Sequence, residues 1–290
     1  MKTIRQPSRR ITAMAAAAAM ATGLLAFGHT PVHASNETAP ESSPQQVVFE
    51  DNFDGMAGTG PDPTKWRHDI GGNGWGNAEL QYYTDSTDNV AHDGNGNLVI
   101  TARQGNPGNH QCWYGYCEYT SGKLTTGETF TQAYGTFEAR IKLPRGQGIW
   151  PAFWMLGDNF TDIGWPNCGE IDIMENIGRE PSTVHGTVHG PGYSGAGGIG
   201  NSYTLPGGDE FADDFHTFTL EWAPGSLTWY VDGNQFSHLT PADLNGNPWV
   251  FDHPFFMIIN LAVGGEWPGY PDDSTQFPQV MLIDYIKVTA

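Results

Sequence analysis

The sequence predicts an all-β fold, a β-jelly-roll sandwich of two antiparallel sheets in which one concave sheet offers an open substrate cleft. Three observations support this prediction. The chain contains 38 glycines and 20 prolines, long helical periodicity is missing, and short apolar runs recur between turn residues. In chain order, we expect strands at residues 97–104, 135–143, 149–156, 170–176, 183–189, 215–222, 227–231, 255–263 and 280–289.

Tryptophans mark one face of the strand expected at 149–156. Its odd-numbered positions are apolar and suit the core, whereas Trp150 and Trp154 share the opposite face. A single tryptophan on a sandwich strand is usually part of the packing. Two with the same orientation, close to a strand that carries carboxylates, leave packing and stacking on a sugar ring as equal alternatives. Trp75, Trp165 and Trp267 stand in glycine- or proline-rich loops, which favours contacts at the rim of the cleft.

The most informative segment follows at residues 169–176, where three carboxylates are interleaved with apolar residues. Glu170 and Asp172 share one face of the expected strand, while the isoleucines beside them point to the core. By the same alternation Glu175 would also face the core, where an unpaired carboxylate is costly. One extra residue, a β-bulge near positions 173–174, would return Glu175 to the side of Glu170 and Asp172.

This arrangement predicts acid–base chemistry. Three carboxylates on one strand face repel one another, so at least one should keep its proton near neutral pH. A neutral carboxylic acid beside an ionised carboxylate is the pair that glycoside hydrolysis requires. The alternative is a solvent-facing acidic strip on an edge strand, which is disfavoured because like charges on one face destabilise a sheet without any gain in packing.

Residues 215–231 are typical of a β-hairpin. Bulky residues at positions 216, 218, 220 and 222 alternate with Thr217, Thr219 and Glu221, the pattern of a half-buried strand. The turn Ala-Pro-Gly-Ser at 223–226 then connects this strand to 227–231.

The first 34 residues have the pattern of a secretory signal peptide. Lys2, Arg5, Arg9 and Arg10 precede the apolar run 13–27, and Val-His-Ala at 32–34 supplies a small-residue cleavage site. We therefore expect a secreted, extracellular protein, with the general and the twin-arginine export routes both open. Residues 35–46 are expected to be a disordered lead-in. Residues 47–290 are expected to be a single domain, since no later linker, repeat or change of composition is found.

The acidic composition narrows the classes of ligand. The chain has a formal net charge of −19. Loss of the signal peptide, with four of the 13 Lys and Arg and none of the 32 Asp and Glu, would leave −23. Such a surface repels nucleic acid, anionic membranes and polyanionic polysaccharides, whereas a neutral ligand stays compatible. Solubility outside the cell explains the acidity equally well. We expect no nucleic-acid or membrane partner, and a monomer.

The chain has three cysteines. Cys112 and Cys117 enclose a short loop that one disulfide would close. Cys168 is then left over, two residues before Glu170 on the same strand face. A buried structural cysteine is favoured there over a catalytic thiol, because no base stands nearby in the sequence.

Five ordered sequence blocks carry a resemblance to a known family. They are Gly-Glu-Ile-Asp-Ile-Met-Glu at 169–175, Trp-Pro-Ala-Phe-Trp-Met-Leu at 150–156, His-Gly-Thr-Val-His at 185–189, Asn-Leu-Ala-Val-Gly-Gly at 260–265 and Trp-Pro-Gly at 267–269. Over nearly all of residues 47–290 the chain resembles the laminarinase-like endo-1,3-β-glucanases of glycoside hydrolase family 16. The resemblance implies a β-jelly roll and a retaining hydrolysis of internal β-1,3-glucosidic bonds. It also implies Glu170 as nucleophile, Glu175 as general acid/base and Asp172 as their supporting partner.

Four further residues are candidates for substrate binding. Asn77 and Arg103 resemble family residues that bind sugar hydroxyls, and Asn260 could do the same. A surface ion pair is the alternative for Arg103. His189 either lies beside the carboxylates or is simply a hydrogen-bonded strand histidine.

Family members often carry a structural calcium ion away from the cleft. The resemblance implies Asp284 as the carboxylate ligand and the backbone carbonyls of Glu50 and Gly96 as further ligands, since calcium prefers oxygen. An edge-strand charge is the alternative for Asp284. No cofactor is expected for catalysis, and the expected partner is a β-glucan polysaccharide.

Two alternative functions stay open. A sugar-binding lectin can use the same fold, although a binding protein has no need of three aligned carboxylates. A related enzyme could instead cleave mixed-linkage β-1,3-1,4-glucan or galactan, or act as a transglycosylase. The extra residue in the family motif at 169–175 and the tryptophans favour 1,3-glucan. The acidic chain disfavours sulfated galactan.

Overall fold

The computed structural model describes residues 46–290, which form mostly β-structure. The predicted signal peptide and all but the last residue of the predicted lead-in lie outside the described residues. Helical segments in the described part are short: α1 (Phe160–Ile163) and the 3-10 turns η1 (Gly195–Gly197), η2 (Pro206–Gly208) and η3 (Pro241–Leu244). From residue 46 onwards, no helix is long and apolar enough to cross a membrane.

The larger sheet has ten strands. Its order is β17-β16-β15-β10-β19-β5-β8-β3, with β1 beside β19 and β4 beside β5. All of its ladders are antiparallel except the parallel pair β3–β8. The strands are β1 (Val47–Asp51), β3 (Gln81–Tyr83), β4 (Val90–His92), β5 (Leu98–Gln104), β8 (Tyr119–Ser121), β10 (Gly135–Lys142), β15 (His216–Ala223), β16 (Ser226–Val231), β17 (Asn234–Leu239) and β19 (Gln279–Thr289).

The smaller sheet has seven antiparallel strands in the order β14-β13-β12-β11-β18-β9-β2. They are β2 (Arg67–His68), β9 (Lys123–Thr125), β11 (Ile149–Gly157), β12 (Glu170–Glu175), β13 (Thr183–His189), β14 (Ile199–Thr204) and β18 (Phe255–Val263). A separate two-stranded hairpin is formed by β6 (Gln111–Cys112) and β7 (Gly115–Tyr116).

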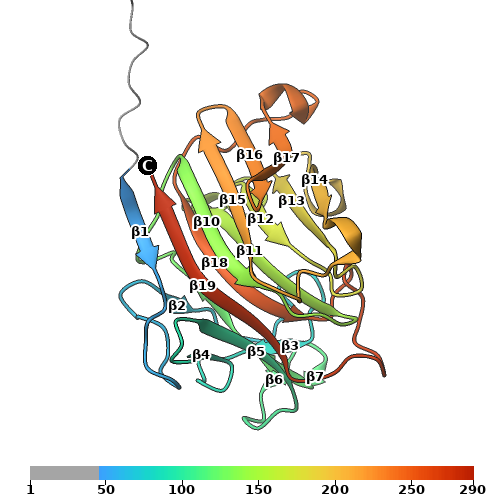
Figure 1. Cartoon of the computed structure of the whole chain (residues 1–290). Helices are drawn as coiled ribbons and strands as arrows, with labels where there is room; N and C mark the ends of the chain where they lie inside the picture. Colours follow the sequence, from blue (N-terminus) through green and yellow to red (C-terminus); the bar gives the residue numbers. More distant parts are fainter. Residues whose placement is uncertain (1–45) are drawn as a thin grey trace, which may run out of the picture. The chain divides into compact units, whose positions relative to one another are not determined.

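The core lies between the two sheets because each sheet turns one set of alternating apolar side chains inward. In Figure 1 the strands β10 and β19 of the larger sheet lie over β11 and β18 of the smaller one. Phe137 and Ile141 of β10 and Phe153 and Met155 of β11 are fully buried in one continuous core. Each such side chain contributes roughly 1.5–3 kcal/mol by leaving water. The opposite face of the smaller sheet stays open and carries the tryptophans of β11.

The predicted sandwich of two sheets is confirmed, and each of the nine expected strands is present with bounds shifted by at most one residue. The strands that the sequence did not predict are mostly two or three residues long. β2, β3, β4 and β6 to β9 belong to this group. Such short segments carry too little alternation to be recognised, because they depend on pairing with residues distant in the chain.

Candidate active site

A β-bulge in β12 brings three carboxylates to one face of the smaller sheet. Opposite β11, Met174 pairs with Phe153 and Asp172 pairs with Trp154, so that Ile173 is the extra residue. Ile173 and Met174 are both buried in the core. Glu175, Asp172 and Glu170 therefore face alternate residues of β11, namely Ala152, Trp154 and Leu156. The bulge expected near positions 173–174 is confirmed.

The carboxylates lie in an open cleft of about 880 Å³ on this face. Strands β2, β9, β11, β12 and β18 form its floor, and loop 75–79 and segment 158–165 contribute to its walls. Aromatic and polar side chains alternate in the lining: Trp75, Asn77, Glu79, Tyr83, Lys123, Trp150, Trp154, Trp165, Glu170, Asp172, Glu175 and Asn260. A cleft of this size, with several aromatic surfaces and many groups that can form hydrogen bonds, suits a polyhydroxylated ligand.

We call Glu170, Asp172, Glu175 and His189 the carboxylate end of the cleft. His189 Nε2 lies 3.1 Å from Asp172 Oδ2 and 3.8 Å from Glu170 Oε1. Among the described residues, Asp172 Oδ2 and His189 Nδ1 are buried without a properly aligned hydrogen-bond partner. Of the two alternatives for His189, the structure therefore favours the position beside the carboxylates.

Burial and mutual repulsion raise the pKa of all three carboxyl groups. Burial, and then the charge of Asp172, raises the pKa of Glu170 to about 8. Burial raises the pKa of Asp172 to about 7, against a hydrogen bond with Glu170 that lowers it. Burial and the charges of Asp172 and Glu170 raise the pKa of Glu175 well above its usual range. Glu175 therefore keeps its proton while a charge resides on the other two.

Three neighbours oppose these shifts. The indole Nε1 of Trp150 donates a hydrogen bond to Glu175 Oε1 over 3.1 Å, which lowers the pKa of Glu175. His189, and then the Trp165 indole, lower the pKa of Glu170. The chemistry that results is a proton donor at one position of the strand and, a few positions away, a carboxylate that can ionise.

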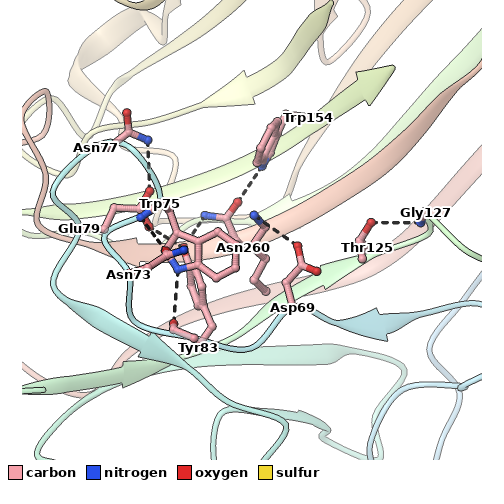
Figure 2. A network of polar contacts seen from close by, with 12 residues as sticks. Asp69, Asn73, Trp75, Asn77, Glu79, Tyr83, Thr125, Gly127, Trp154 and Asn260 are labelled. Carbon is pink, nitrogen blue, oxygen red and sulfur yellow. Dashed lines mark hydrogen bonds and ion pairs between the residues drawn. The ribbon is translucent and has the colours of Figure 1, made fainter. Parts of the chain in front are cut away.

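At the other side of the cleft a chain of hydrogen bonds runs beneath the tryptophans (Figure 2). Trp154 Nε1 donates to Asn260 Oδ1 over 2.7 Å, and Asn260 Nδ2 donates to the Tyr83 hydroxyl over 3.0 Å. That hydroxyl donates to Glu79 Oε2 over 3.2 Å, while Asn77 Nδ2 donates to Glu79 Oε1 over 3.2 Å. We call Asn77, Glu79, Tyr83, Trp154 and Asn260 the amide end of the cleft.

Lys123 supplies a positive charge to the amide end. Its ammonium lies 4.0 Å from the centre of the Trp75 ring and 3.3 Å from Asp69 Oδ2. Lys123 is only 7% exposed, so this ion pair and the cation–π contact compensate a nearly complete loss of hydration. The ammonium also fixes Trp75 at the edge of the cleft.

The structure brings most of the predicted substrate-binding residues together. Asn77, Trp150, Trp154, Trp165 and Asn260 all line the cleft. Trp165 is 43% exposed, as expected for a rim position.

Trp267 is 37% exposed and lies next to the cleft. Its ring meets that of Trp150 edge to face at 5.6 Å. It also meets His185, which lies opposite Glu175 in the β12–β13 register. Trp267 therefore extends the aromatic surface beyond Trp150.

Arg103 is a correction. The structure places it outside the cleft, with its guanidinium Nε donating to the carbonyl of Asp88 over 2.8 Å on the exposed surface. The reason is strand alternation at the end of β5, where Ala102 occupies the core side and Arg103 turns to solvent. The sugar contact expected for Arg103 is therefore not supported.

The residues expected to bind calcium do not fit such a site. Asp284 Oδ2 forms an ion pair with Arg140 Nη1 at 2.5 Å, and the Glu50 carbonyl accepts a hydrogen bond from Lys65 Nζ at 2.7 Å. Two cationic groups thus occupy the oxygens that a calcium ion would need. Gly96 remains as a glycine with positive φ in the turn before β5. The calcium expectation for Glu50, Gly96 and Asp284 is therefore corrected.

The cysteines follow the sequence prediction. Cys112 and Cys117 form a disulfide with a Cα–Cα distance of 5.0 Å. Cys168 is free and fully buried, packed near Leu156 and Ile258. Burial, and then the charge of Glu170, raises the pKa of its thiol to about 11. A protonated buried thiol is a structural residue rather than a nucleophile.

Several residues of the cleft had not been singled out from the sequence, and three of them belong to the hydrogen-bond chain or carry its neighbouring positive charge. Glu79, Tyr83 and Lys123 lie in short strands or turns where no periodicity marks their orientation. A glutamate, a glutamine and two tyrosines at 79–83, within an otherwise glycine- and polar-rich loop, are the one signal that could have indicated a buried polar network.

Comparison with known proteins gives consistent matches. Residues 77–287 match the sequence profile described as Glycosyl hydrolases family 16. A beta-glucanase of Rhodothermus marinus is 42% identical over 253 residues, with 84% of each chain covered. The glucan endo-1,3-beta-glucosidase A1 of Niallia circulans is 38% identical over 268 residues, covering 87% of this chain and 39% of that protein. The solved laminarinase catalytic domain of Thermotoga maritima is 50% identical, with a TM-score of 0.78 and coverage of 85% and 98%.

Proposed function

The chain belongs to family 16 of the glycosyl hydrolases, and from this premise we propose that it is a secreted endo-acting enzyme that cleaves internal β-1,3-glucosidic bonds of laminarin-type β-glucans with retention of configuration. The observation that carries the proposal is the bulge at Ile173, which turns Glu175 to the same face as Glu170 and Asp172. The basic and apolar pattern of residues 1–34 supports export.

The first step uses the proton on Glu175. We assign Glu175 as the general acid that protonates the glycosidic oxygen, because its pKa is raised by burial and by two neighbouring carboxylates. The carboxylate of Glu170 attacks the anomeric carbon as the bond to the leaving sugar breaks. The product is a glycosyl ester on Glu170 and a released chain end.

The second step reverses the proton transfer. Glu175, now ionised, takes a proton from a water molecule, whose oxygen attacks the anomeric carbon and releases Glu170. Two inversions at one carbon leave the original configuration. Asp172 lies between these groups and orients Glu170, while His189 lies beside them, lowers the pKa of Glu170 and so helps it to ionise before each cycle.

The lining of the cleft supports the proposed substrate class. Trp75, Trp150, Trp154 and Trp165 offer flat apolar surfaces for the C–H faces of glucose, and the acidic chain disfavours sulfated polymers. The cleft is open rather than a closed pocket, which supports attack within a chain. The relatives named beta-glucanase and glucan endo-1,3-beta-glucosidase favour the same substrate.

The decisive experiment measures reducing-end release from laminarin, lichenan and agarose by the wild-type protein and by Glu170→Gln. We expect laminarin to be the preferred substrate, early products of mixed length, and a loss of at least roughly 10³-fold in the variant. Proton NMR of the first products should show the β-anomer before mutarotation. A wild-type rate that survives in Glu170→Gln would remove Glu170 from the proposed role, and a first-formed α-anomer would exclude retention.

Two outcomes would support the alternatives. Preferred cleavage of lichenan would indicate a mixed-linkage β-1,3-1,4-glucanase. Binding of laminarin without any cleavage would indicate a glucan-binding lectin, for which the raised pKa values of the carboxylates would have no use.

A further inference from the structure

The β6–β7 hairpin carries an exposed tryptophan in a fixed orientation. Trp113 is 53% exposed, yet both of its N–H groups are hydrogen-bonded. Its backbone N–H donates to the Gly72 carbonyl and its indole Nε1 donates to the Glu79 carbonyl, each over 2.8 Å. Gly74 packs against the ring, since a Cβ at that position would lie 2.9 Å from Trp113 Cδ1. The ring thus rests on loop 72–79 and leaves an apolar surface in water.

The hairpin is locked to that loop by further contacts. The Cys112–Cys117 disulfide closes its base. Gly72 lies so close to Cys112 that a Cβ there would be 2.5 Å from the sulfur. The hydroxyl of Tyr114 donates to the Leu80 carbonyl over 2.7 Å, and its ring meets Trp113 edge to face at 5.4 Å. A rigidly held aromatic ring loses little conformational entropy when it binds a ligand.

The same loop forms part of the cleft wall. Trp75, Gly76, Asn77 and Glu79 line the cleft, and Figure 2 shows Trp75, Asn77 and Glu79 at the amide end. Gly74, which carries the Trp113 ring, immediately precedes Trp75 in the chain. In Figure 1 the hairpin lies beside β3 and β5, at one end of the sandwich. The exposed ring is therefore held by the same loop that forms this wall of the cleft.

We propose that Trp113 is an additional stacking platform that continues the cleft beyond Trp75 and binds a distal sugar unit of a long, neutral glucan chain. The inference rests on the proposed function and deepens it, because it predicts a preference for polymer over short oligosaccharides. The chemistry fits a pyranose ring: the indole N–H is already satisfied by Glu79, so the exposed face offers only π-surface to sugar C–H groups.

The test is Trp113→Ala assayed on 1,3-linked oligosaccharides from three to eight units and on laminarin polymer. We expect KM for the polymer to rise about tenfold with kcat unchanged, and the effect to disappear for the trimer. Trp113→Phe should recover part of the affinity for the polymer. Trp249→Ala is the control, since Trp249 is also hydrogen-bonded through its indole but belongs to the segment between η3 and β18, which contributes neither to loop 72–79 nor to the cleft lining.

Thermal unfolding of each variant distinguishes loss of the platform from loss of the hairpin. An equal change of KM for every chain length, or no change for the polymer, would overturn the proposal. If the wild-type protein cleaves no glucan, the proposed function fails independently. In that case retardation of the protein in a laminarin-containing gel still tests the platform, and equal retardation of wild type and Trp113→Ala would overturn it.

Discussion

The two ends of the cleft both bury a glutamate, and they treat it in opposite ways. At the amide end, Glu79 is 6% exposed and burial raises its pKa, but Gln81, Asn77 and Tyr83 all donate hydrogen bonds to it. At the carboxylate end, the partners of Glu175 are two further carboxylates, which raise its pKa further. The nature of the neighbours, rather than burial alone, distinguishes the hydrogen-bonded Glu79 from Glu175, the acid that we propose for catalysis.

The two ends of the cleft also differ in how many of their buried polar atoms form hydrogen bonds. The amide end uses both polar atoms of Asn260 and both carboxyl oxygens of Glu79. In the described part of the chain, Asp172, His185 and His189 each leave one buried polar atom without a hydrogen-bond partner near Glu175. A binding surface benefits from rigidity, whereas groups that exchange protons during a reaction need open positions for a substrate.

The largest expected effect comes from replacing the proposed acid at the carboxylate end. In Glu175→Gln, kcat/KM on laminarin should fall by about 10²–10⁴-fold, because no acid protonates the leaving oxygen. A glucoside with a dinitrophenolate leaving group needs no such proton, so its first step should be nearly unaffected and a burst of phenolate should appear. Glu79→Gln is the matched control and should keep kcat within about tenfold on both substrates. Equal losses on both substrates in Glu175→Gln would contradict the assignment of Glu175 as the acid.

Next in size is the loss of the hydrogen-bond chain at the amide end. Asn260→Ala leaves the Trp154 indole without its partner and removes the amide that donates to the Tyr83 hydroxyl, which should lower the free energy of unfolding by about 1–3 kcal/mol. KM should rise more than kcat falls, because the change loosens the binding surface and leaves the acid in place. Chemical denaturation and steady-state kinetics measure both. Asn201→Ala, on the edge strand β14, loses one hydrogen bond to Ser237 outside the cleft, and should leave KM and kcat unchanged.

A smaller effect concerns stability at alkaline pH. Burial holds the folded-state pKa of Glu170 at about 8, above its usual value, so the folded protein binds protons more tightly than the unfolded chain. Stability should therefore decrease as pH rises from about 4.5 to 8. Glu170→Gln removes this contribution and should raise Tm at pH 8 by about 2–5 °C relative to wild type, with little gain at pH 4. The exposed Glu118→Gln should show no such gain, and an equal gain at both pH values would point to packing instead.

The smallest expected effect comes from removing one hydrogen bond at the carboxylate end. The Trp150 indole stabilises the charged form of Glu175, so Trp150→Phe should raise the pKa of Glu175. The alkaline limb of the kcat/KM profile should then move upward by about half a pH unit. Trp154→Phe loses its bond to Asn260 and should leave that limb in place. A downward shift in Trp150→Phe would contradict the proposed proton donor.

Prediction from the sequence was most successful where side chains alternate regularly along a strand and where burial of a carboxylate would be costly. Nine strands showed enough alternation to be predicted, and the expense of burying Glu175 indicated the bulge before any coordinates. It performed least well where geometry depends on distant pairing. Glu79 and Lys123 lie in segments too short for periodicity, and Arg103 turned to solvent at a strand end that family resemblance had placed near the sugar. The calcium expectation overlooked Arg140 and Lys65, whose cationic groups only meet Asp284 and Glu50 in the folded chain.

The extra residue at position 173 makes the direction of Glu175 insensitive to most mutations at that position. Its side chain packs in the core, so any apolar replacement of suitable size preserves the count of backbone units that aims Glu175. Deletion of residue 173 would remove the bulge and restore regular alternation, in which Met174 keeps the core face and Glu175 keeps the face of Glu170 and Asp172. The direction of the proposed acid therefore tolerates both an apolar substitution and the loss of this one residue, whereas an added residue elsewhere between Asp172 and Glu175 would turn Glu175 to the core.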